Sequence, residues 1–401
     1  MKINTMRLID KYVGIPLTFL VSSLINFYEL IKGKNPKNPD ISKTLFIELS
    51  EMGSAIIADP AMRKLQKNGA ELFFLIFKDN QKSLNILATV KPQNIFAIRS
   101  DTFSNLTIDI WKFFLWSRKN KLTCVIDLEL FSRITSLLTA LTFAKSRVGF
   151  STLHDEGCYR GNILTHGVRY NSHVHIAYNF MSLVNRTLGL CQDDYPTCKI
   201  MPREVMVPKA EISTEQLDAV RAKIVEVYPK FNKQKIVLIN PNASQLLPQR
   251  RWPKDNFITV IKQLLSQHKK IIVLITGSQE EKNEAQEIIK QVDDNRCINS
   301  AGMFEFDQLA PLYKLATLML TNDSGPAHFA SVTKLTVLVI FGPETPNLYL
   351  PLGGNAQAFY LNLPCSPCVS AHNHRKTSCK MPVCVNNIKT ETVIKKINKN
   401  L

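Results

Sequence analysis

The expected fold depends on the stretch Leu320-Thr321-Asn322-Asp323-Ser324-Gly325-Pro326-Ala327-His328-Phe329-Ala330. An apolar run over residues 316–320 predicts a buried strand, and the turn residues at 323–325 end it. Pro326 suits the first position of a helix, so we expect a helix to begin here. Asp323 and Ser324 can accept hydrogen bonds from the free amides of that first turn. The stretch therefore predicts a strand, a turn and a helix start in direct succession.

A second apolar run, residues 335–341, is followed by Gly342-Pro343-Glu344-Thr345-Pro346. Two neighbouring strands would then bring polar turns to one edge of a sheet, where ligands bind in open parallel sheets. Gly325 lets the backbone approach a ligand closely, and the amides of a helix start attract anions. The pattern favours a site for a phosphorylated ligand. An ordinary helix cap is the other interpretation of Asp-Ser-Gly-Pro taken alone.

Together the two segments resemble the donor-site signature of glycosyltransferase family 9, the ADP-heptose:lipopolysaccharide heptosyltransferases. By the order of motifs the resemblance covers roughly residues 43–385, and it includes Asn240-Pro241-Asn242-Ala243-Ser244, Arg250-Arg251-Trp252-Pro253 and a cysteine-rich tail. It implies the α/β GT-B fold, in which two Rossmann-like domains face each other across a cleft. It also implies an inverting, metal-independent transfer of a sugar, expected to be heptose, from a nucleotide-diphosphate donor to a lipopolysaccharide core acceptor.

Composition agrees with a globular protein of two domains. The chain has 401 residues, of which 45% are hydrophobic and 21% charged. Fifty Lys and Arg against 33 Asp and Glu give a net charge of +17, which favours polyanionic partners. We find no nucleic-acid motif with interleaved aromatic residues, so we expect no nucleic-acid partner and favour an anionic membrane surface.

We expect three parts in the chain: a membrane-associating helix and linker over residues 1–40, an acceptor-side Rossmann-like domain over 41–200, and a donor-side domain with the cysteine-rich tail over 201–401. The apolar run 13–31 has basic flanks and predicts an interfacial helix. The family resemblance implies that the membrane surface is the cytoplasmic face of the inner membrane. Its polar residues and short length argue against a span. A single membrane anchor and a soluble packing helix are the alternatives.

The resemblance implies a set of donor-binding residues, namely Ser244, Arg250, Glu280, Asp323, Ser324, Gly325, His328 and Gly342. Arg250 stands where the family commonly has a Lys on the donor phosphates, and its fixed positive charge would stabilise the leaving diphosphate. A carboxylate near the ribose is also implied, and Glu280 and Glu281 are equally placed for it. The Lys-rich segment after Thr390 is expected to form a helix that returns to the first domain.

On the acceptor side the resemblance singles out Gly53, Ser54 and Asp127, at the ends of strands predicted over residues 43–49 and 122–128. In the family a Gly-Asp pair supplies the general base, but here Ser54 follows Gly53. Glu51 lies in the same turn and becomes our predicted base, with Glu129 and Asp59 as weaker candidates. The alternatives are a nucleotide-sugar-binding protein that has lost its base, or a transferase that uses another sugar donor.

Nine cysteines fall into two groups. Cys124, Cys158, Cys191, Cys198 and Cys297 are scattered, which is typical of a protein kept reduced in the cytosol. Cys365, Cys368, Cys379 and Cys384 lie close together in the tail. Their spacing suits a structural zinc site, with a disulfide as the alternative. Apart from the nucleotide-sugar donor, no cofactor is required.

Overall fold

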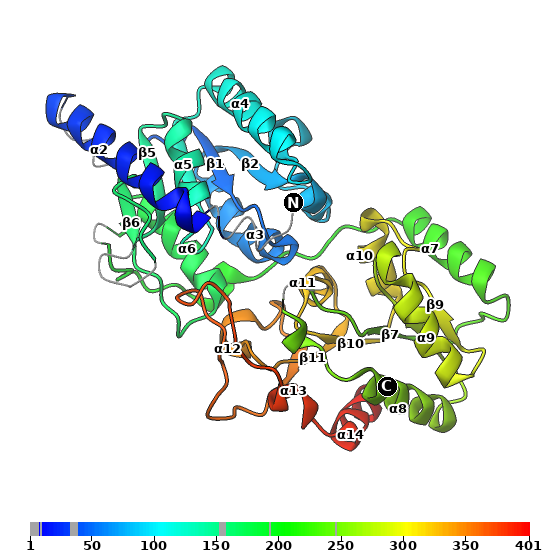
Figure 1. Ribbon diagram of the computed structural model, residues 1–401. Coiled ribbons are helices and arrows are strands. Elements are labelled where there is room, and N and C mark those ends of the chain that lie inside the picture. Colours follow the sequence, from blue (N-terminus) through cyan, green and yellow to red (C-terminus); the bar gives the residue numbers. More distant parts are fainter. Residues whose placement is uncertain (1–7, 9, 33–38, 152–157, 192–193, 245–246) are drawn as a thin grey trace. The chain divides into compact units, whose positions relative to one another are not determined.

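The computed structural model describes residues 8, 10–32, 39–151, 158–191, 194–244 and 247–401. Residue contacts divide the chain into two compact units (Figure 1). Unit 1 comprises Met1–Met206 and Ala371–Arg375, and unit 2 comprises Val207–Ser370 and Lys376–Leu401. The main boundary thus falls at Met206, whereas we expected it at residue 200.

Unit 1 contains a parallel sheet whose strand order, among the described residues, is β3-β2-β1-β4-β5-β6. The strands are β1 (Lys43–Ile47), β2 (Glu71–Phe77), β3 (Ile95–Ile98), β4 (Cys124–Asp127), β5 (Ser146–Phe150) and β6 (His166–Val168). Side chains alternate between the two faces, and both faces of the central strands β1 and β2 are buried, so these two strands appear in the sequence as largely apolar runs.

Helices cover both faces of this sheet. They are α3 (Met52–Lys67), α4 (Phe103–Asn120), α5 (Arg133–Leu141) and α6 (Ile176–Thr187), together with the short helices η1 (Lys78–Asn85), η2 (Pro92–Asn94) and η3 (Pro202–Val205). Phe113 of α4 and Leu138 of α5 share one hydrophobic core with Leu45 and Phe73 of the sheet. Helices α3 and α6 pack against each other on the opposite face (Figure 1). This doubly wound arrangement places the strand ends and their loops at the rim.

Unit 2 contains a second parallel sheet, with the order β12-β11-β10-β7-β8-β9 over the described part of the chain. Its strands are β7 (Lys235–Asn240), β8 (Ile271–Ile275), β9 (Cys297–Asn299), β10 (Leu318–Asn322), β11 (Thr336–Ile340) and β12 (Ala356–Phe359). Its helices are α7 (Thr214–Val227), η4 (Pro248–Arg250), α8 (Lys254–Gln267), η5 (Gln279–Glu281), α9 (Lys282–Val292), α10 (Phe306–Leu315), α11 (Gly325–Phe329), η6 (Ala330–Val332), α12 (Pro346–Tyr349), α13 (Val383–Asn386) and α14 (Thr390–Asn400).

The register of unit 2 confirms the central prediction from the sequence. Asn322 at the end of β10 pairs with Ile340 at the end of β11. On the other side Thr321 pairs with Asn240, the last residue of β7. Because all three strands run parallel, the turns at Asp323 and Gly342 leave the sheet at the same edge.

The predicted course of the C-terminal segment is wrong. Helix α14 belongs to unit 2, where Val393 and Ile397 lie in the same hydrophobic core as α8. An earlier segment, Ala371–Arg375, belongs to unit 1 instead. There the ring of His372 packs 5.6 Å from Phe131, between centroids. The amphipathic pattern of α14 could not reveal which of two cores it completes.

The predicted N-terminal helix is confirmed as α2 (Gly14–Lys32), which packs against α5 in unit 1. The residues from 33 to 38, in the predicted linker, lie outside the described residues. In the part of the chain that the structure describes, no helix is both long and apolar enough to cross a membrane.

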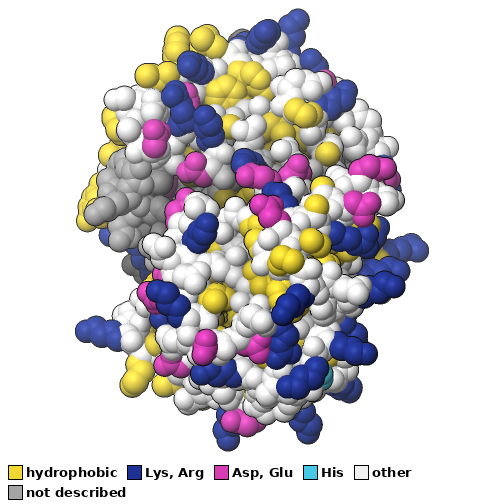
Figure 2. Space-filling view, turned by 90° about the vertical axis from the view of Figure 1, so that its right-hand side faces the viewer, with side chains coloured by type: hydrophobic (Ala, Val, Ile, Leu, Met, Phe, Trp, Pro, Cys, Tyr) yellow, Lys and Arg dark blue, Asp and Glu magenta, His cyan; other side chains and the backbone are white. Residues whose placement is uncertain are grey.

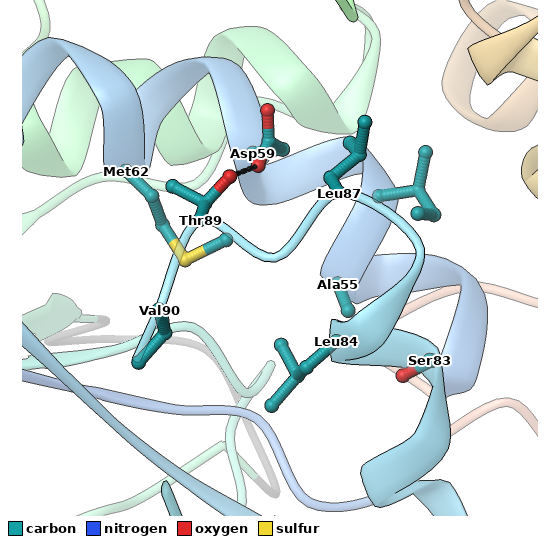
Figure 3. A pocket seen from close by; sticks show the side chains of 9 residues that line it. Ala55, Asp59, Met62, Ser83, Leu84, Leu87, Thr89 and Val90 are labelled. Carbon is teal, nitrogen blue, oxygen red and sulfur yellow. Dashed lines mark hydrogen bonds between the residues drawn. The ribbon is translucent and has the colours of Figure 1, made fainter. Parts of the chain in front are cut away.

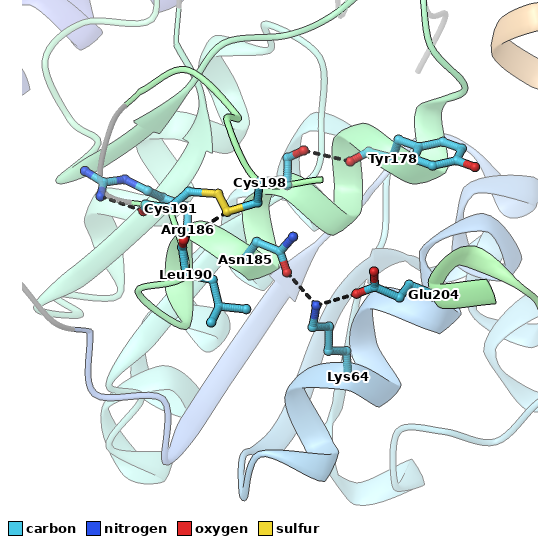
Figure 4. The surroundings of a disulfide bond; sticks show 9 residues. Lys64, Tyr178, Asn185, Arg186, Leu190, Cys191, Cys198 and Glu204 are labelled. Carbon is cyan, nitrogen blue, oxygen red and sulfur yellow. Dashed lines mark hydrogen bonds and ion pairs between the residues drawn. A yellow bond between two sulfur atoms is a disulfide. The ribbon is translucent and has the colours of Figure 1, made fainter. Parts of the chain in front are cut away.

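The structure corrects one prediction about the cysteines and does not confirm another. Cys191 and Cys198, which we expected to be reduced, form a disulfide (Figure 4). Beside it, Lys64 Nζ donates to Asn185 Oδ1 and lies 2.7 Å from Glu204 Oε1, which ties α3 to α6 and η3. Within the described residues no three His, Cys, Asp or Glu side chains gather in a way that could hold a metal ion. The zinc site predicted at the tail cysteines therefore has no support in the structure.

Candidate functional site

Arg250 is the central side chain at the strand edge of unit 2. Its Nη2 donates to Glu344 Oε1 at 3.2 Å, and its Nε lies 3.4 Å from Asp323 Oδ2. Asp323 follows β10 and Glu344 follows β11, so one guanidinium joins the ends of both strands. All three side chains are largely buried, with 16%, 6% and 1% exposed for Arg250, Asp323 and Glu344.

Burial changes the protonation of this cluster. It raises the pKa of Glu344 to about 8, although the positive charge of Arg250 acts in the opposite direction. Burial also raises the pKa of Asp323, again opposed by Arg250. At neutral pH Glu344 is therefore mostly protonated, while the charge of Arg250 favours the ionised form of Asp323. If Arg250 moves to bind an anion, it gives up its contacts with Asp323 and Glu344. Because Glu344 is mostly protonated, this move does not leave two charged carboxylates side by side.

Asn322 and Arg251 hold the surrounding loops in place. Asn322 Nδ2 donates to Pro241 O at 2.7 Å, and its Oδ1 accepts from Trp252 N at 3.0 Å. Arg251 donates twice to Ala243 O, from Nε at 3.1 Å and from Nη2 at 2.9 Å. These bonds tie the loop after β7 to the end of β10. Arg251 consequently has a bracing role, while its neighbour Arg250 points to the two carboxylates.

The expected capping of the next helix is wrong. Ser324 occupies the cap position of α11, but its side chain accepts from no amide of the helix. Its Oγ donates to Asn322 O at 3.1 Å instead, and Asp323 pairs with Arg250. Helix α11 has only five residues. The polar residues of this turn therefore stabilise the strand end.

The remaining donor-side residues occupy different positions around this edge. Gly342 packs directly over α13, where an added Cβ would lie 2.3 Å from Val385 Cγ1, so packing alone requires a glycine. His328 is buried in α11, whereas Ser244 is exposed in the loop after β7. Gly325 begins α11. Their donor contacts stay predictions.

The two candidate ribose carboxylates can now be distinguished. Glu281 Oε2 accepts from Ser278 N at 2.7 Å and caps the turn after β8. Glu280 is exposed, and a hydrogen bond with Ser278 lowers its pKa. Glu280 is therefore the carboxylate that has exposed oxygens available for a ligand.

The equivalent edge of unit 1 is rich in carboxylates. Ile47 at the end of β1 pairs with Asp127 at the end of β4, so the residues after both strands lie together. Glu129 Oε1 accepts from Leu49 N at 3.0 Å, from Ser50 N at 3.0 Å and from Ser50 Oγ at 2.8 Å. Three donors on one oxygen fix Glu129 as a brace of the β1 turn.

Asp127 is also committed, because it is fully buried and forms an ion pair with Arg160. Burial raises the pKa of Asp127 to about 6, opposed by the charge of Arg160. Arg160 Nε in turn donates to Ser136 Oγ at 2.7 Å and to Ser132 O at 3.1 Å. Asp127 thus anchors the loop that carries Arg160 to β4 and α5.

Sequence analysis missed Glu48, the residue that directly follows β1. It lies 4% exposed, and burial together with the nearby charge of Glu129 raises its pKa well above the usual range. We had placed it inside the predicted strand 43–49. A charged residue that interrupts an otherwise apolar buried strand was the signal that could have marked the strand end.

Glu51 is the accessible carboxylate of this edge, with 38% of its side chain exposed. It precedes α3 but makes no capping bond, and it forms an ion pair with Arg375 from the segment Ala371–Arg375. Gly53 and Ser54 are buried in the first turn of α3, and Ser54 N donates to Glu51 O at 3.2 Å. A serine hydroxyl there cannot act as the missing carboxylate, which leaves Glu51 as the exposed acid of the turn.

Asp59 lies away from the strand edge, further along α3. It accepts a hydrogen bond from Thr89 and one from Arg63 Nε at 2.7 Å, and it lines a small pocket with Met62 and Leu87 (Figure 3). Burial raises its pKa. Asp59 is 1% exposed and links α3 to the loop after η1, away from the strand edge, so it is not a candidate base.

A family model for glycosyltransferase family 9 (heptosyltransferase) matches residues 120–378, which is more than half of the chain. The chain belongs to glycosyltransferase family 9. Among curated relatives, the lipooligosaccharide heptosyltransferase 2 of Campylobacter jejuni is 30% identical over 171 residues, or 42% of this chain and 52% of that protein. The lipopolysaccharide heptosyltransferase 2 of Escherichia coli is 23% identical over 184 residues, covering 45% and 51%. The chain spans about half the length of the curated relatives that it matches.

Solved structures extend the similarity to most of the chain. The ADP-heptose lps heptosyltransferase II of E. coli has a TM-score of 0.66 at 18% identity, and the match covers 89% of this chain and 98% of that chain. The E. coli heptosyltransferase WaaC with ADP has a TM-score of 0.61 at 13% identity, with 90% and 100% covered. At these identities the likeness establishes the fold, and the predicted GT-B fold is confirmed.

Proposed function

We propose that this family 9 protein transfers a heptose from ADP-heptose to the core of a lipopolysaccharide acceptor, with inversion at the sugar carbon. The observation that carries the proposal is Arg250, held at the joined ends of β10 and β11 beside Asp323 and Glu344. The names of the relatives support the choice of sugar, because heptosyltransferases are found among both the sequence and the structural matches.

In the proposed reaction Arg250 binds the diphosphate of the donor. Two N–H groups of a guanidinium match two phosphate oxygens, and this contact replaces the present contacts to Glu344 and Asp323. As the bond between the sugar and the phosphate breaks, negative charge grows on the diphosphate. A fixed guanidinium in a largely buried position stabilises that charge without a metal ion.

Glu51 is our proposed general base. It accepts the proton of the acceptor hydroxyl while that oxygen forms a bond to the anomeric carbon and the diphosphate leaves from the opposite side. Glu51 is 38% exposed, and its ion pair with Arg375 must open when it takes the proton. Glu129 is occupied by three donors and Asp127 is fully buried with Arg160, so neither is as accessible to an acceptor as Glu51.

The acceptor is expected to be an anionic glycolipid, and the site of action the cytoplasmic face of the inner membrane. The net charge of +17 supports an anionic partner. Transfer is tested by incubating the purified protein with ADP-heptose and heptose-deficient lipopolysaccharide in detergent, and measuring released ADP and glycolipid-bound heptose. We expect both products in equal amounts.

Two outcomes of that assay would contradict the proposal. If ADP-heptose binds but neither ADP nor modified glycolipid forms, the protein is a nucleotide-sugar-binding protein without a base, the alternative that Ser54 suggests. If another nucleotide sugar is turned over and ADP-heptose is not, the transferase uses a different donor. The Glu51→Gln protein, which keeps the donor site intact, serves as the inactive control.

A further inference from the structure

Helix α2 turns its small and polar residues toward the protein. Gly14, Thr18 and Ser22 recur every four residues and are buried. Ser22 Oγ accepts from Asn162 N at 2.7 Å, and an added Cβ on Gly14 would lie 3.0 Å from Arg133 Cβ. Of the polar residues that argued against a membrane span, Ser22 and Asn26 bond Asn162 and Thr18 is buried, whereas Ser23 is exposed.

The outer face of α2 is apolar. Leu20, Leu24, Phe27, Leu30 and Ile31 are between 55% and 83% exposed. In a soluble protein an amphipathic helix has the opposite polarity, with its apolar stripe on the core. The other exposed large apolar side chains of the helix are Ile15, Leu17, Phe19 and Tyr28. An apolar face along a helix of about 28 Å is far larger than the single exposed residues of ordinary surfaces.

A second exposed apolar stripe lies on α4. Ile108, Trp111 and Leu115 follow the spacing of one helical face and are 47%, 62% and 50% exposed. Lys112, Arg118 and Lys119 are exposed on the same helix. Figure 2 shows hydrophobic side chains among Lys and Arg at the upper end of the view, where α4 lies in Figure 1.

Helix α5 lies between the two surfaces. Helix α2 packs on α5, and Phe143, just after α5, contacts Phe114 of α4 with ring centroids 6.2 Å apart. Arg118 lies over the ring of Phe143 at 5.6 Å. Phe143 is itself 66% exposed. We call the outer face of α2, the α4 stripe and Phe143 the apolar platform of unit 1.

We propose that the apolar platform binds an anionic membrane surface, with α2 lying in the headgroup region parallel to the bilayer. A spanning α2 would have to lose its packing on α5, and no described helix meets the length and hydropathy of a span. Exposed Lys11, Lys112 and Lys119 provide the positive charge that anionic headgroups attract, and the sequence continues after α2 with Lys34 and Lys37. The inference rests on the proposed function, because membrane binding would bring the protein to the surface at which a glycolipid acceptor lies.

Cosedimentation of the full chain with vesicles tests the proposal. The vesicles contain phosphatidylethanolamine and phosphatidylglycerol, with phosphatidylcholine vesicles as the uncharged comparison. We expect binding to the anionic vesicles and a loss of about tenfold or more in the Leu20→Glu/Phe27→Glu protein, since two charges would enter the apolar contact. The matched control is Val225→Glu/Val227→Glu, which adds the same charges at exposed apolar positions of α7 and should bind like the wild type.

Two results would overturn the membrane proposal. One is equal vesicle binding by the Leu20→Glu/Phe27→Glu and wild-type proteins. The other is a wild-type dimer that this double substitution converts to a monomer without any vesicle binding, because a second copy of the chain would then cover α2. Thermal unfolding of both variants checks that they fold.

Trp111 tests the α4 part of the platform. Of the three tryptophans it is the exposed one, while Trp252 is 2% exposed and Trp116 is partly buried. Brominated lipids should quench the wild-type fluorescence, and most of that quenching should disappear in Trp111→Phe. Equal quenching in both proteins would remove α4 from the membrane contact.

Failure of this proposal can be separated from failure of the proposed function. The vesicles contain no acceptor, so binding does not depend on transfer. Conversely, the Leu20→Glu/Phe27→Glu protein should transfer heptose to a detergent-dispersed acceptor at the wild-type rate. A loss of transfer in detergent as well would show that α2 acts on the catalytic site and not through the membrane.

Discussion

The carboxyl-terminal edges of the two sheets differ in the charged groups that they carry. At the edge of unit 2, one buried guanidinium, Arg250, is shared by Asp323 and Glu344, and burial keeps Glu344 mostly protonated at neutral pH. At the edge of unit 1, Glu48 and Glu129 stand close enough for their charges to interact, and Arg375 pairs with Glu51 on the outside. Two units of the same doubly wound fold thus carry different groups at this edge: the guanidinium of Arg250 in unit 2 and the accessible carboxylate of Glu51 in unit 1.

This difference matches the two halves of a sugar transfer. A departing diphosphate needs positive charge, and an acceptor hydroxyl needs a base. At each edge one residue is accessible or releasable while its neighbours are fixed by protein contacts. The proposed function gives the chemistry to Arg250 and Glu51, and each prediction below tests one of the two edges.

The largest effect is expected for Arg250→Ala. Loss of a preorganised charge at a leaving group costs about 10²- to 10³-fold in rate, so kcat should fall by that order. The neighbouring Arg251→Ala protein is the matched control, because Arg251 contacts Ala243 O and Glu284 rather than the two carboxylates of the site, and it should keep most of its activity. Steady-state kinetics with ADP-heptose measures both.

Stability provides a second check on Arg250. Its removal takes the neighbouring positive charge from Asp323, while Glu344 is already mostly protonated at neutral pH, and this destabilises the fold. Arg250→Ala/Asp323→Asn should recover thermal stability without recovering transfer. Recovery of transfer along with stability would mean that Arg250 supports only the fold.

Glu51→Gln should be the next largest effect, with kcat lower by about 10²- to 10⁴-fold and donor affinity unchanged. Added formate or azide should restore part of the activity of Glu51→Ala, because a small anion can take the proton. Binding of ADP to the same protein is measured by calorimetry. If Glu51→Gln has the wild-type kcat, Glu51 is not the general base, and another residue must take the proton.

Glu344→Gln tests the protonation of the unit 2 cluster and should have a moderate effect. In the wild type the pKa of Glu344 is raised to about 8, so a rise in pH through this value adds a negative charge beside the diphosphate site. Donor affinity should fall up to about tenfold per pH unit above the pKa, and Glu344→Gln should abolish this dependence. The measurement is the donor KM between pH 6.5 and 9. If KM rises with pH in the same way in the wild type and in Glu344→Gln, Glu344 is not the group that titrates beside the donor.

The same shift predicts the pH dependence of stability. The pKa of Glu344 is higher in the folded state, about 8, than its ordinary value of 4.5, so the folded chain binds the extra proton. Its contribution to the free energy of unfolding is fully present below pH 4.5 and is lost as the pH rises toward 8. Glu344→Gln should lack this loss.

Glu48→Gln should have the smallest effect, within about threefold of the wild-type rate. Its carboxyl group is buried with a pKa raised well above the usual range, so an amide resembles its protonated form. A loss as large as that of Glu51→Gln would show that Glu48, and not Glu51, handles the acceptor proton.

The sequence predicted those helices and strands that have a clear local signal, such as a long apolar run. The apolar runs of β1 and β11 lie within the predicted strands 43–49 and 335–341, and α2 lies within one residue of the predicted run 13–31. The edge strands β6 and β12 escaped prediction because they are short, and β12 is only partly buried. Their strand form depends on a neighbouring strand rather than on their own sequence.

The sequence predicted where the candidate site lies, but not which of its side chains contact one another. The motifs placed Asp323, Gly342 and Arg250 at one edge, since parallel strands align their ends. That Arg250 would pair with Glu344, and that Ser324 would not cap its helix, depends on the packing of the loops. No local pattern reveals that Ala371–Arg375 leaves unit 2 to bring Arg375 to Glu51.

The most direct test of the account is a calorimetric titration of ADP into three proteins at neutral pH: wild type, Arg250→Ala and Glu51→Gln. The account predicts that the wild type and Glu51→Gln bind ADP with the same affinity, and that Arg250→Ala binds at least about tenfold more weakly. Equal binding by Arg250→Ala, or no binding by the wild type, would contradict the assignment of the β10–β11 edge to a nucleotide diphosphate.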